Sequence, residues 1–183
     1  LRVAVNVSVK QLQQDNFVEQ VKLALEQAQL PPYLLELEIT ESAAMSNVED
    51  NITKLSQLKA LGVYISIDDF GTAYSSLNYL KRLPVNSLKI DRSFVHDIDS
   101  QTENQANNMA IVRSIIALGK NMDLQLVAEG VETAQQVKFL RDIGCDEAQG
   151  FYFSKPMPAK ELEHFVQPVQ PNAVATLTSR TLS

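Results

Sequence analysis

Oxygen-bearing and charged side chains recur where short apolar runs end, and these are the residues whose types could perform chemistry. Carboxylate and amide oxygens with no histidine among them favour hard divalent cations, Mg²⁺ or Mn²⁺, over zinc or copper. Carboxylates that gather at one place repel one another, and a bound cation removes that cost. In chain order the set is Asn6, Glu38, Asp68 with neighbouring Asp69, Lys89, Glu129 and Gln149.

The adjacent pair Asp68 and Asp69 is the most specific part of this pattern. Two neighbouring carboxylates at the end of a strand can serve two ions, because one carboxylate can bridge them. This layout is typical of two-metal phosphoester hydrolysis, in which one ion generates hydroxide and both stabilise the in-line transition state. Lys89 adds one compensating positive charge and can hold or orient a water molecule.

Each of these residues also has an ordinary structural interpretation. A strand-end carboxylate such as Glu38 is more often solvated or paired with a cation, and an isolated lysine such as Lys89 usually reaches solvent. Asp68 and Asp69 can begin a turn, and Asn6 can satisfy backbone groups. Because the runs all deliver polar groups to the same end, the chemical interpretation is favoured.

The elements that position these residues follow from the apolar runs themselves. Each run is followed by a helical pattern, and strand–helix alternation predicts parallel strands joined by right-handed crossovers. Capping side chains three residues ahead of a carboxylate or amide predict helix starts at Asn16, Ser46 and Thr133. The predicted strands are Val3–Val7, Leu35–Ile39, Val63–Ile67, Ser87–Ile90, Leu124–Ala128 and Glu147–Phe153.

Alternation within the runs separates two α/β architectures. One face of the runs is apolar (Leu35, Leu37 and Ile39 in the second), whereas the other carries polar groups toward its carboxyl end. An open doubly wound sheet needs apolar residues on both faces. A barrel needs them beneath its ring of helices and gathers polar groups at the mouth formed by the carboxyl ends of its strands. The sequence therefore predicts a TIM-like (β/α) barrel.

The number of βα units and the two ends of the chain determine the bounds of the predicted domain. About six βα units are present, whereas the common barrel closes with eight. Leu1 lies inside a predicted strand, so we expect an N-terminally truncated barrel over residues 1–166. Residues 167–183 carry a single charge, Arg180, and no apolar periodicity, which predicts a flexible C-terminal tail.

Composition narrows the class of protein. The 183 residues are 45% hydrophobic and 21% charged, which is an ordinary globular balance. The net charge of −6 argues against broad contact with a nucleic-acid polymer or an anionic membrane. No apolar stretch approaches the roughly 18 residues of a membrane span, and we expect a cytoplasmic segment. Cys145 is the single cysteine, so no internal disulfide can form, and we interpret it as a small buried residue.

Six segments of the chain share their order and residue types with one known family. They are Val5–Ser8, Glu38–Ser42, Asp68–Leu77, Leu88–Asp91, Ala128–Glu132 and Gln149–Phe151. These motifs resemble those of the EAL-domain family, the bacterial phosphodiesterases that hydrolyse cyclic diguanylate (cyclic di-GMP). The resemblance covers residues 1–166, and its motifs are highly specific in this order. It implies a barrel of the EAL type, in agreement with the fold predicted above.

The resemblance also implies a reaction, in which water attacks one phosphodiester and opens the ring to linear pGpG. Lys89 is implied to contact the attacking water, and Glu129 is also implied as general base. Glu41 is implied to anchor the loop that runs from Asp68 to Ser76. The implied ligands of two Mg²⁺ or Mn²⁺ ions are Asn6, Glu38, Asp68, Asp69 and Glu129; the implied catalytic residues are Lys89, Glu129, Glu132 and Glu41; the implied substrate contacts are Gln149 and Asp69.

Two departures from the family pattern stand out. Ala73 occupies a position where the family often has glycine. The motif that names the family, with its metal-binding glutamate, is expected upstream of Leu1. All the other positions that inactive members usually lose are intact, which favours an enzyme over the alternative, a catalytically inactive cyclic di-GMP-binding sensor. The resemblance further implies upstream sensory or GGDEF domains in the parent protein, and leaves a homodimer open.

Overall fold

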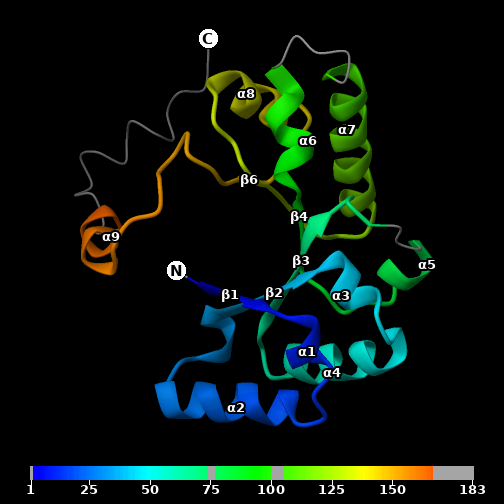
Figure 1. Cartoon of the computed structure of the whole chain (residues 1–183), viewed down its shortest axis with the longest axis vertical. Coiled ribbons are helices and arrows are strands. Elements are labelled where there is room, and N and C mark those ends of the chain that lie inside the picture. The colour runs from blue at the N-terminus through cyan, green and yellow to red at the C-terminus, as the bar shows by residue number, and fades with distance from the viewer. Residues whose placement is uncertain (1, 74–76, 100–104, 167–183) are drawn as a thin grey trace. The chain divides into compact units, whose positions relative to one another are not determined.

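The strands lie in the sheet in the same order as in the sequence. The computed structural model describes residues 2–73, 77–99 and 105–166. Six strands form one sheet in the order β1-β2-β3-β4-β5-β6, and every neighbouring pair is parallel (Figure 1). Helices lie between successive strands, so the predicted strand–helix alternation is confirmed.

The first five strands agree closely with the predicted runs, and the sixth is much shorter. Within β3 the strand continues beyond the predicted end and includes both aspartates of the strongest motif. The strands are β1 (Val3–Val7), β2 (Leu35–Thr40), β3 (Tyr64–Phe70), β4 (Ser87–Ile90), β5 (Gln125–Ala128) and β6 (Glu147–Ala148).

The chain bends after β6 because it packs closely against the loop after β5. Val131 donates its N–H to the Gln149 carbonyl (3.0 Å), and Tyr152 donates its N–H to the Val131 carbonyl (3.0 Å). A Cβ added to Gly150 would lie 2.1 Å from the Val131 carbonyl oxygen, so only glycine fits there. The predicted strand Glu147–Phe153 is therefore wrong beyond Ala148.

The helices follow the strands as predicted, although several are short. Two 3₁₀ turns, η1 (Pro32–Leu34) and η2 (Asp97–Asp99), extend the connections. The α-helices are α1 (Val9–Leu12), α2 (Phe17–Ala28), α3 (Glu41–Met45), α4 (Val48–Ala60), α5 (Leu77–Leu80), α6 (Arg92–His96), α7 (Gln105–Asn121), α8 (Ala134–Asp142) and α9 (Ala159–Phe165).

Two of the three predicted helix starts, at Asn16 and Thr133, are confirmed, and at one of them the predicted side-chain cap is also present. Thr133 forms a capping box with Gln136 at the start of α8. The predicted cap at Ser46 is wrong, because α4 begins after Asn47 and the Ser46 hydroxyl donates to the Ala43 carbonyl at the end of α3 (2.7 Å). Asn16 precedes α2, but its side chain accepts no backbone N–H of the helix.

The hydrophobic core lies on one face of the sheet, as the alternation predicts. Helices α4 and α7 pack on the strands from this side, α4 against β3 and α7 against β4 and β5. The opposite face carries the polar residues and is only partly buried. The strand residues of the core are all 6% exposed or less: Val7, Leu37, Ile39, Ile65, Ile67, Phe70, Leu88, Ile90, Leu126 and Ala128.

The chain divides into two compact units. The first comprises residues 1–153 and contains the whole sheet, and the second begins at residue 154 and contains α9. The domain boundary expected at residue 166 stays a prediction, and the expected flexible tail, residues 167–183, lies outside the described residues. In the part of the chain that the structure describes, no helix has both the length and the apolar character to cross a membrane.

Candidate metal centre

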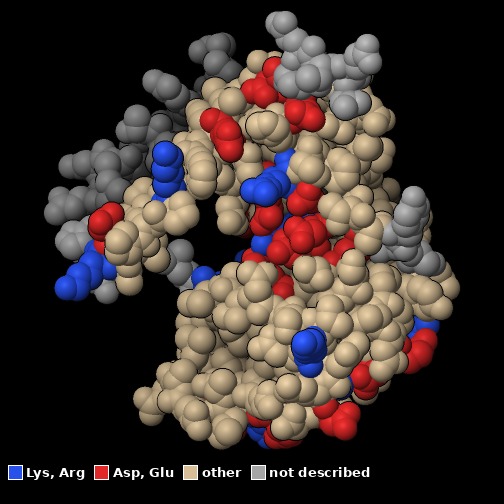
Figure 2. Space-filling view, viewed as in Figure 1, with Lys and Arg blue, Asp and Glu red and all other residues tan. Residues whose placement is uncertain are grey.

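Parallel pairing brings the polar strand ends to one edge of the sheet. In the register of β1 and β2, Asn6 lies opposite Glu38, and in that of β4 and β5, Lys89 lies opposite Val127, two residues before Glu129. The carboxyl ends of parallel strands share one edge, which is where barrel enzymes place their sites. Figure 2 shows acidic side chains gathered over the region of β3 and β4, with basic side chains beside them.

Three carboxylates form the centre of this cluster. Oxygen atoms of Asp68, Asp69 and Glu129 all lie within 4.8 Å of one another. Strand alternation by itself would send neighbouring residues to opposite faces. The register between β3 and β4 shifts between Ile67 and Phe70, and Asp69 has a φ of 52°, so a bulge turns both aspartates toward one place.

Lys89 is the buried cation of the cluster. The residue is 5% exposed, and its Nζ lies 2.6 Å from Glu38 Oε1, 2.6 Å from Glu129 Oε1 and 3.3 Å from Asp68 Oδ1. Burial by itself would lower the pKa of Lys89, but the hydrogen bonds with Glu129 and Glu38 raise it above its ordinary value. One ammonium group therefore faces three carboxylates, which leaves the cluster with excess negative charge.

Burial and, to a smaller extent, the neighbouring carboxylates raise the pKa values of two carboxyls of the cluster. Burial raises the pKa of Glu129, Lys89 lowers it in part, and Asp68 and Glu38 raise it further. Burial also raises the pKa of Asp69, and the neighbouring Asp68 and Asp91 add to that shift. An oxygen-only donor set with uncompensated negative charge fits a hard divalent cation.

Asp91 is a member of the site to which the sequence analysis assigns no role. Its carboxyl raises the pKa of Asp69, and it accepts from the N–H of Ser93 (3.0 Å) and from the Ser93 hydroxyl. Burial would raise the pKa of Asp91, but the bonds from Ser93 lower it below its ordinary value. Its place directly after β4, where the other strands also end in polar groups, is the signal that could have identified it.

Glu41 connects α3 to the loop that follows the paired aspartates. It is 2% exposed, and its Oε2 accepts the backbone N–H groups of Gly71 (2.9 Å) and Ala73 (3.2 Å). Gly71 has a φ of 100° and packs against Phe94, which restricts that position to glycine. The rest of the expected loop, residues 74–76, lies outside the described residues.

The other expected site residues lie around the cluster rather than in it. Asn6 is exposed beside Glu38, and Glu38 is bound to Lys89. The side chain of Gln149 has no hydrogen-bond partner among the described residues, although its backbone is bonded to β5. Glu132 lines a pocket of about 330 Å³ together with Arg92, Ser93, His96 and Gly130.

Cys145 has the surroundings of an inert thiol. Its Sγ lies within hydrogen-bond distance of the carbonyls of Leu126 (3.5 Å) and Glu147 (3.2 Å). Burial raises the pKa of Cys145 to about 11. At neutral pH the thiol is therefore protonated, which argues against a nucleophilic role.

The EAL domain family model matches residues 1–156 of the chain. The chain is 48% identical to the cyclic di-GMP phosphodiesterase NbdA of Pseudomonas aeruginosa, over 98% of this chain and 22% of the relative. It is 40% identical to the cyclic di-GMP phosphodiesterase PdeR of Escherichia coli, over 90% of this chain and 24% of the relative. The chain thus spans about a quarter or less of the length of these curated relatives.

Solved structures show the same fold. The PaMucR phosphodiesterase in complex with cyclic di-GMP superposes with a TM-score of 0.83 at 48% identity, over 88% of this chain and 64% of that one. The EAL domain of Mycobacterium smegmatis DcpA superposes with a TM-score of 0.82 at 44% identity, over 90% of this chain and 72% of that one. The six parallel strands are therefore part of a TIM-like barrel of the type found in these domains, as predicted.

Proposed function

The chain belongs to the EAL domain family, and from this premise we propose that it carries the catalytic centre of a metal-dependent phosphodiesterase that hydrolyses cyclic di-GMP to linear pGpG. The observation that carries the proposal is the cluster of Asp68, Asp69 and Glu129 around the buried Lys89. The names of NbdA and PdeR as cyclic di-GMP phosphodiesterases support it. So does the structure of PaMucR with cyclic di-GMP.

The carboxylate cluster would hold the metal. Asp68, Asp69 and Glu129 offer the nearest oxygens, and Glu38 and Asn6 lie at the ends of adjacent strands. We propose two Mg²⁺ or Mn²⁺ ions, because the two neighbouring aspartates can serve two sites. When bound, such ions supply Lewis acidity toward the phosphate and the attacking water.

Lys89 and Glu129 have different proposed roles toward the attacking water and its proton. The raised pKa of Lys89 keeps it protonated at neutral pH, so it can donate a hydrogen bond to a water but cannot take its proton. Glu129 lies 2.6 Å from Lys89 and has a raised pKa, which makes it the better proton acceptor. We assign the orientation of the attacking water to Lys89 and the role of general base to Glu129.

Residues around the cluster would hold the dinucleotide and the loop. Glu132 lines a pocket that also contains Arg92, so this pocket offers an acceptor and a cationic donor to a nucleotide. Asp69 and Gln149 are proposed to contact the substrate. Glu41 is proposed to keep the loop after Asp69 in place through its bonds to Gly71 and Ala73.

The wider setting of the site follows from the same proposal. We place the activity in the cytoplasm, where a soluble dinucleotide second messenger is met, and we propose upstream sensory or GGDEF domains in the parent protein. The name of the relative MucR, a bifunctional diguanylate cyclase and cyclic di-GMP phosphodiesterase, supports such a combination. A homodimer is the proposed alternative to a monomer.

Turnover by the purified chain tests the proposal. After circular dichroism has established folding, the protein is incubated with cyclic di-GMP and Mn²⁺, and the products are separated by chromatography. Appearance of pGpG, abolished by a chelator, is the expected result. A protein that binds cyclic di-GMP without producing pGpG, and stays inactive when the expected EAL motif is supplied upstream of Leu1, would instead support the alternative, a binding module.

A further inference from the structure

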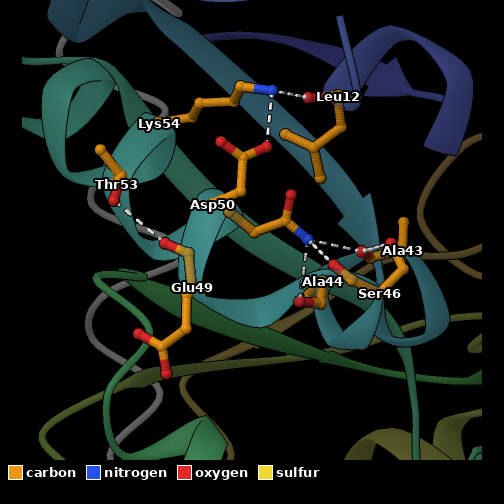
Figure 3. Close-up of polar contacts among 9 residues, drawn as sticks. Leu12, Ala43, Ala44, Ser46, Glu49, Asp50, Thr53 and Lys54 are labelled. Carbon is orange, nitrogen blue, oxygen red and sulfur yellow. Dashed lines mark hydrogen bonds and ion pairs between the residues drawn. The ribbon is translucent and has the colours of Figure 1, made fainter. Parts of the chain in front are cut away.

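Asn51 is a buried amide on α4 that contacts the end of a different helix. The residue is 0% exposed, and its Nδ2 donates to the carbonyl oxygens of Ala43 (3.0 Å), Ala44 (3.2 Å) and Ser46. Figure 3 shows these three carbonyls converging on one nitrogen. The last carbonyls of a helix have no partner within that helix. Asn51 therefore caps the carboxyl end of α3 from outside.

Helix α3 needs this support because it is very short. It spans only Glu41–Met45, and so short a helix forms too few internal hydrogen bonds to offset the cost of nucleation. At its amino end the Thr40 hydroxyl accepts the N–H of Ala43 (3.3 Å). The cap from Asn51 secures the other end, so α3 is held at both ends.

Glu41 transmits the position of α3 to the carboxylate cluster. It is the first residue of α3, and its carboxylate accepts the N–H groups of Gly71 and Ala73. These amides follow Asp69, whose φ of 52° is a strained conformation for a residue other than glycine. Such a conformation persists only where its surroundings hold it. A displaced α3 would therefore release the segment that fixes Asp69.

We propose that Asn51 is a positioning residue for the metal centre, which acts through α3 and Glu41 on Asp69. This inference rests on the proposed function of the cluster. Among the described residues, the amide of Asn51 bonds only to carbonyls at the end of α3, so its effect on the cluster is indirect. Partners that orient metal ligands in this way contribute about 10–100-fold to metal affinity or activity. We expect Asn51→Ala to weaken Mn²⁺ binding about tenfold.

Lys54 provides a matched control on the same helix. It is 7% exposed, and its Nζ donates to the Leu12 carbonyl (3.0 Å) and pairs with Asp50 (2.8 Å), as Figure 3 shows. Like Asn51, it ties α4 to the main chain of another helix, but this helix, α1, carries none of the clustered carboxylates. Lys54→Met should therefore destabilise the fold and leave Mn²⁺ affinity and turnover unchanged.

Direct Mn²⁺ binding to the full chain, followed by electron paramagnetic resonance, is the first measurement. Asn51→Ala should raise the Kd for Mn²⁺ and increase deuterium uptake in a peptide covering residues 69–73, whereas Lys54→Met should do neither. An Asn51→Ala protein that binds Mn²⁺ as tightly as the wild type would overturn the proposal. If Asn51→Ala does not fold, Asn51→Ser, which keeps one donor, is judged by the same criteria.

A double-mutant cycle tests the route through Glu41. In a Glu41→Ala background, Asn51→Ala should cause no further loss of Mn²⁺ affinity, because the connection it uses is already absent. An equal loss in both backgrounds would contradict that route. Because Mn²⁺ binding is measured directly, this test keeps its meaning for a wild-type chain that binds Mn²⁺ without hydrolysing cyclic di-GMP, so failure of this inference is distinguished from failure of the proposed function.

Discussion

The polar face of the sheet carries two layers of residues, and the layer nearer the amino ends of the strands is connected mainly by hydrogen bonds among its own side chains. There the Tyr64 hydroxyl donates to Gln125 (2.6 Å), and Gln125 donates to Glu147 (2.6 Å). Glu36 accepts from Ser66 (2.7 Å) and pairs with a guanidinium group at 3.6 Å. This amino-end layer consists of Arg2, Glu36, Tyr64, Ser66, Gln125 and Glu147.

The layer at the carboxyl ends has similar residue types but a different balance. One ammonium group, from Lys89, is shared by Glu38, Asp68 and Glu129, and Asp69 lies beside them. In the amino-end layer these residues donate to and accept from one another, although the neighbouring Ser87 of β4 has a buried Oγ with no hydrogen-bond partner among the described residues. The carboxyl-end layer is short of positive charge, which a bound divalent cation would supply. The two layers therefore differ less in residue type than in how far their charged and polar groups find partners of opposite character within the chain.

The largest expected effect comes from a substitution at the centre of the carboxyl-end layer. Asp68→Asn keeps the shape of the side chain but removes one negative charge from the cluster, and we expect turnover of cyclic di-GMP to fall by more than about 100-fold. Folding should be little changed, as circular dichroism and urea unfolding would show. Wild-type rates for this variant under saturating Mn²⁺ would rule out the two-metal assignment.

Removal of the shared cation should affect both activity and stability. Lys89→Met leaves several partly buried carboxylates without their counter-charge, which typically costs about 3–5 kcal/mol when a buried pair is broken. Urea unfolding in a chelator should show most of that loss, and added Mn²⁺ should recover part of it. If Lys89→Met and the wild type have the same free energy of unfolding in the chelator, then repulsion among the carboxylates does not destabilise the fold.

The metal-free protein should become less stable as pH rises. The pKa values of Asp69 and Glu129 are raised above their ordinary values of 3.8 and 4.5, so the folded state favours their protonated forms. The stability this provides is complete below those ordinary values and is lost as pH rises through the raised ones. Thermal unfolding from pH 4 to 7 in a chelator should show the decline, and Mn²⁺ should reduce it. If the stability of an Asp69→Asn variant falls with pH as steeply as that of the wild type, the decline does not come from the carboxyl group of Asp69.

The smallest expected effect lies in the amino-end layer. Tyr64→Phe removes one hydrogen bond to Gln125 and should lower the free energy of unfolding by about 1 kcal/mol. Turnover should stay at the wild-type level, because this layer supplies no group to the proposed reaction. A loss of turnover that exceeds the loss of stability would show that the two layers are coupled.

The features that could be predicted from the sequence are those that depend on the alternation of side chains between the two faces of a strand. The apolar face, the strand-end polar groups and the barrel class all follow from local alternation, as in Leu37 against Glu38. Prediction from the sequence failed where tertiary packing overrides that alternation. The bulge that turns Asp69 toward Asp68 depends on the pairing of β3 with β4, and the early end of β6 depends on the contact between Gly150 and Val131.

The roles of single polar residues were also beyond the sequence. Ser46 and Asn51 both lie near the start of α4, and their types alone suit caps, turns or solvent equally well. The structure shows that Ser46 closes α3 and that Asn51 reaches back to the same helix end. Asp91 was likewise left without a role, because its interaction with Asp69 depends on the pairing of β4, which Asp91 directly follows, with β3.

The sequential strand order has a consequence for synthesis on the ribosome. A chain made from its amino end meets, at each strand from β2 to β6, a neighbour that has already been made, so these five pairings do not wait for a later segment. The carboxylates of β2 and β3 would then emerge before the strand that bears Lys89, and Glu129 would follow on β5. Just before β4 is added, the nascent sheet would thus carry three carboxylates of the cluster and no ammonium group, a stage at which a divalent cation would already favour folding.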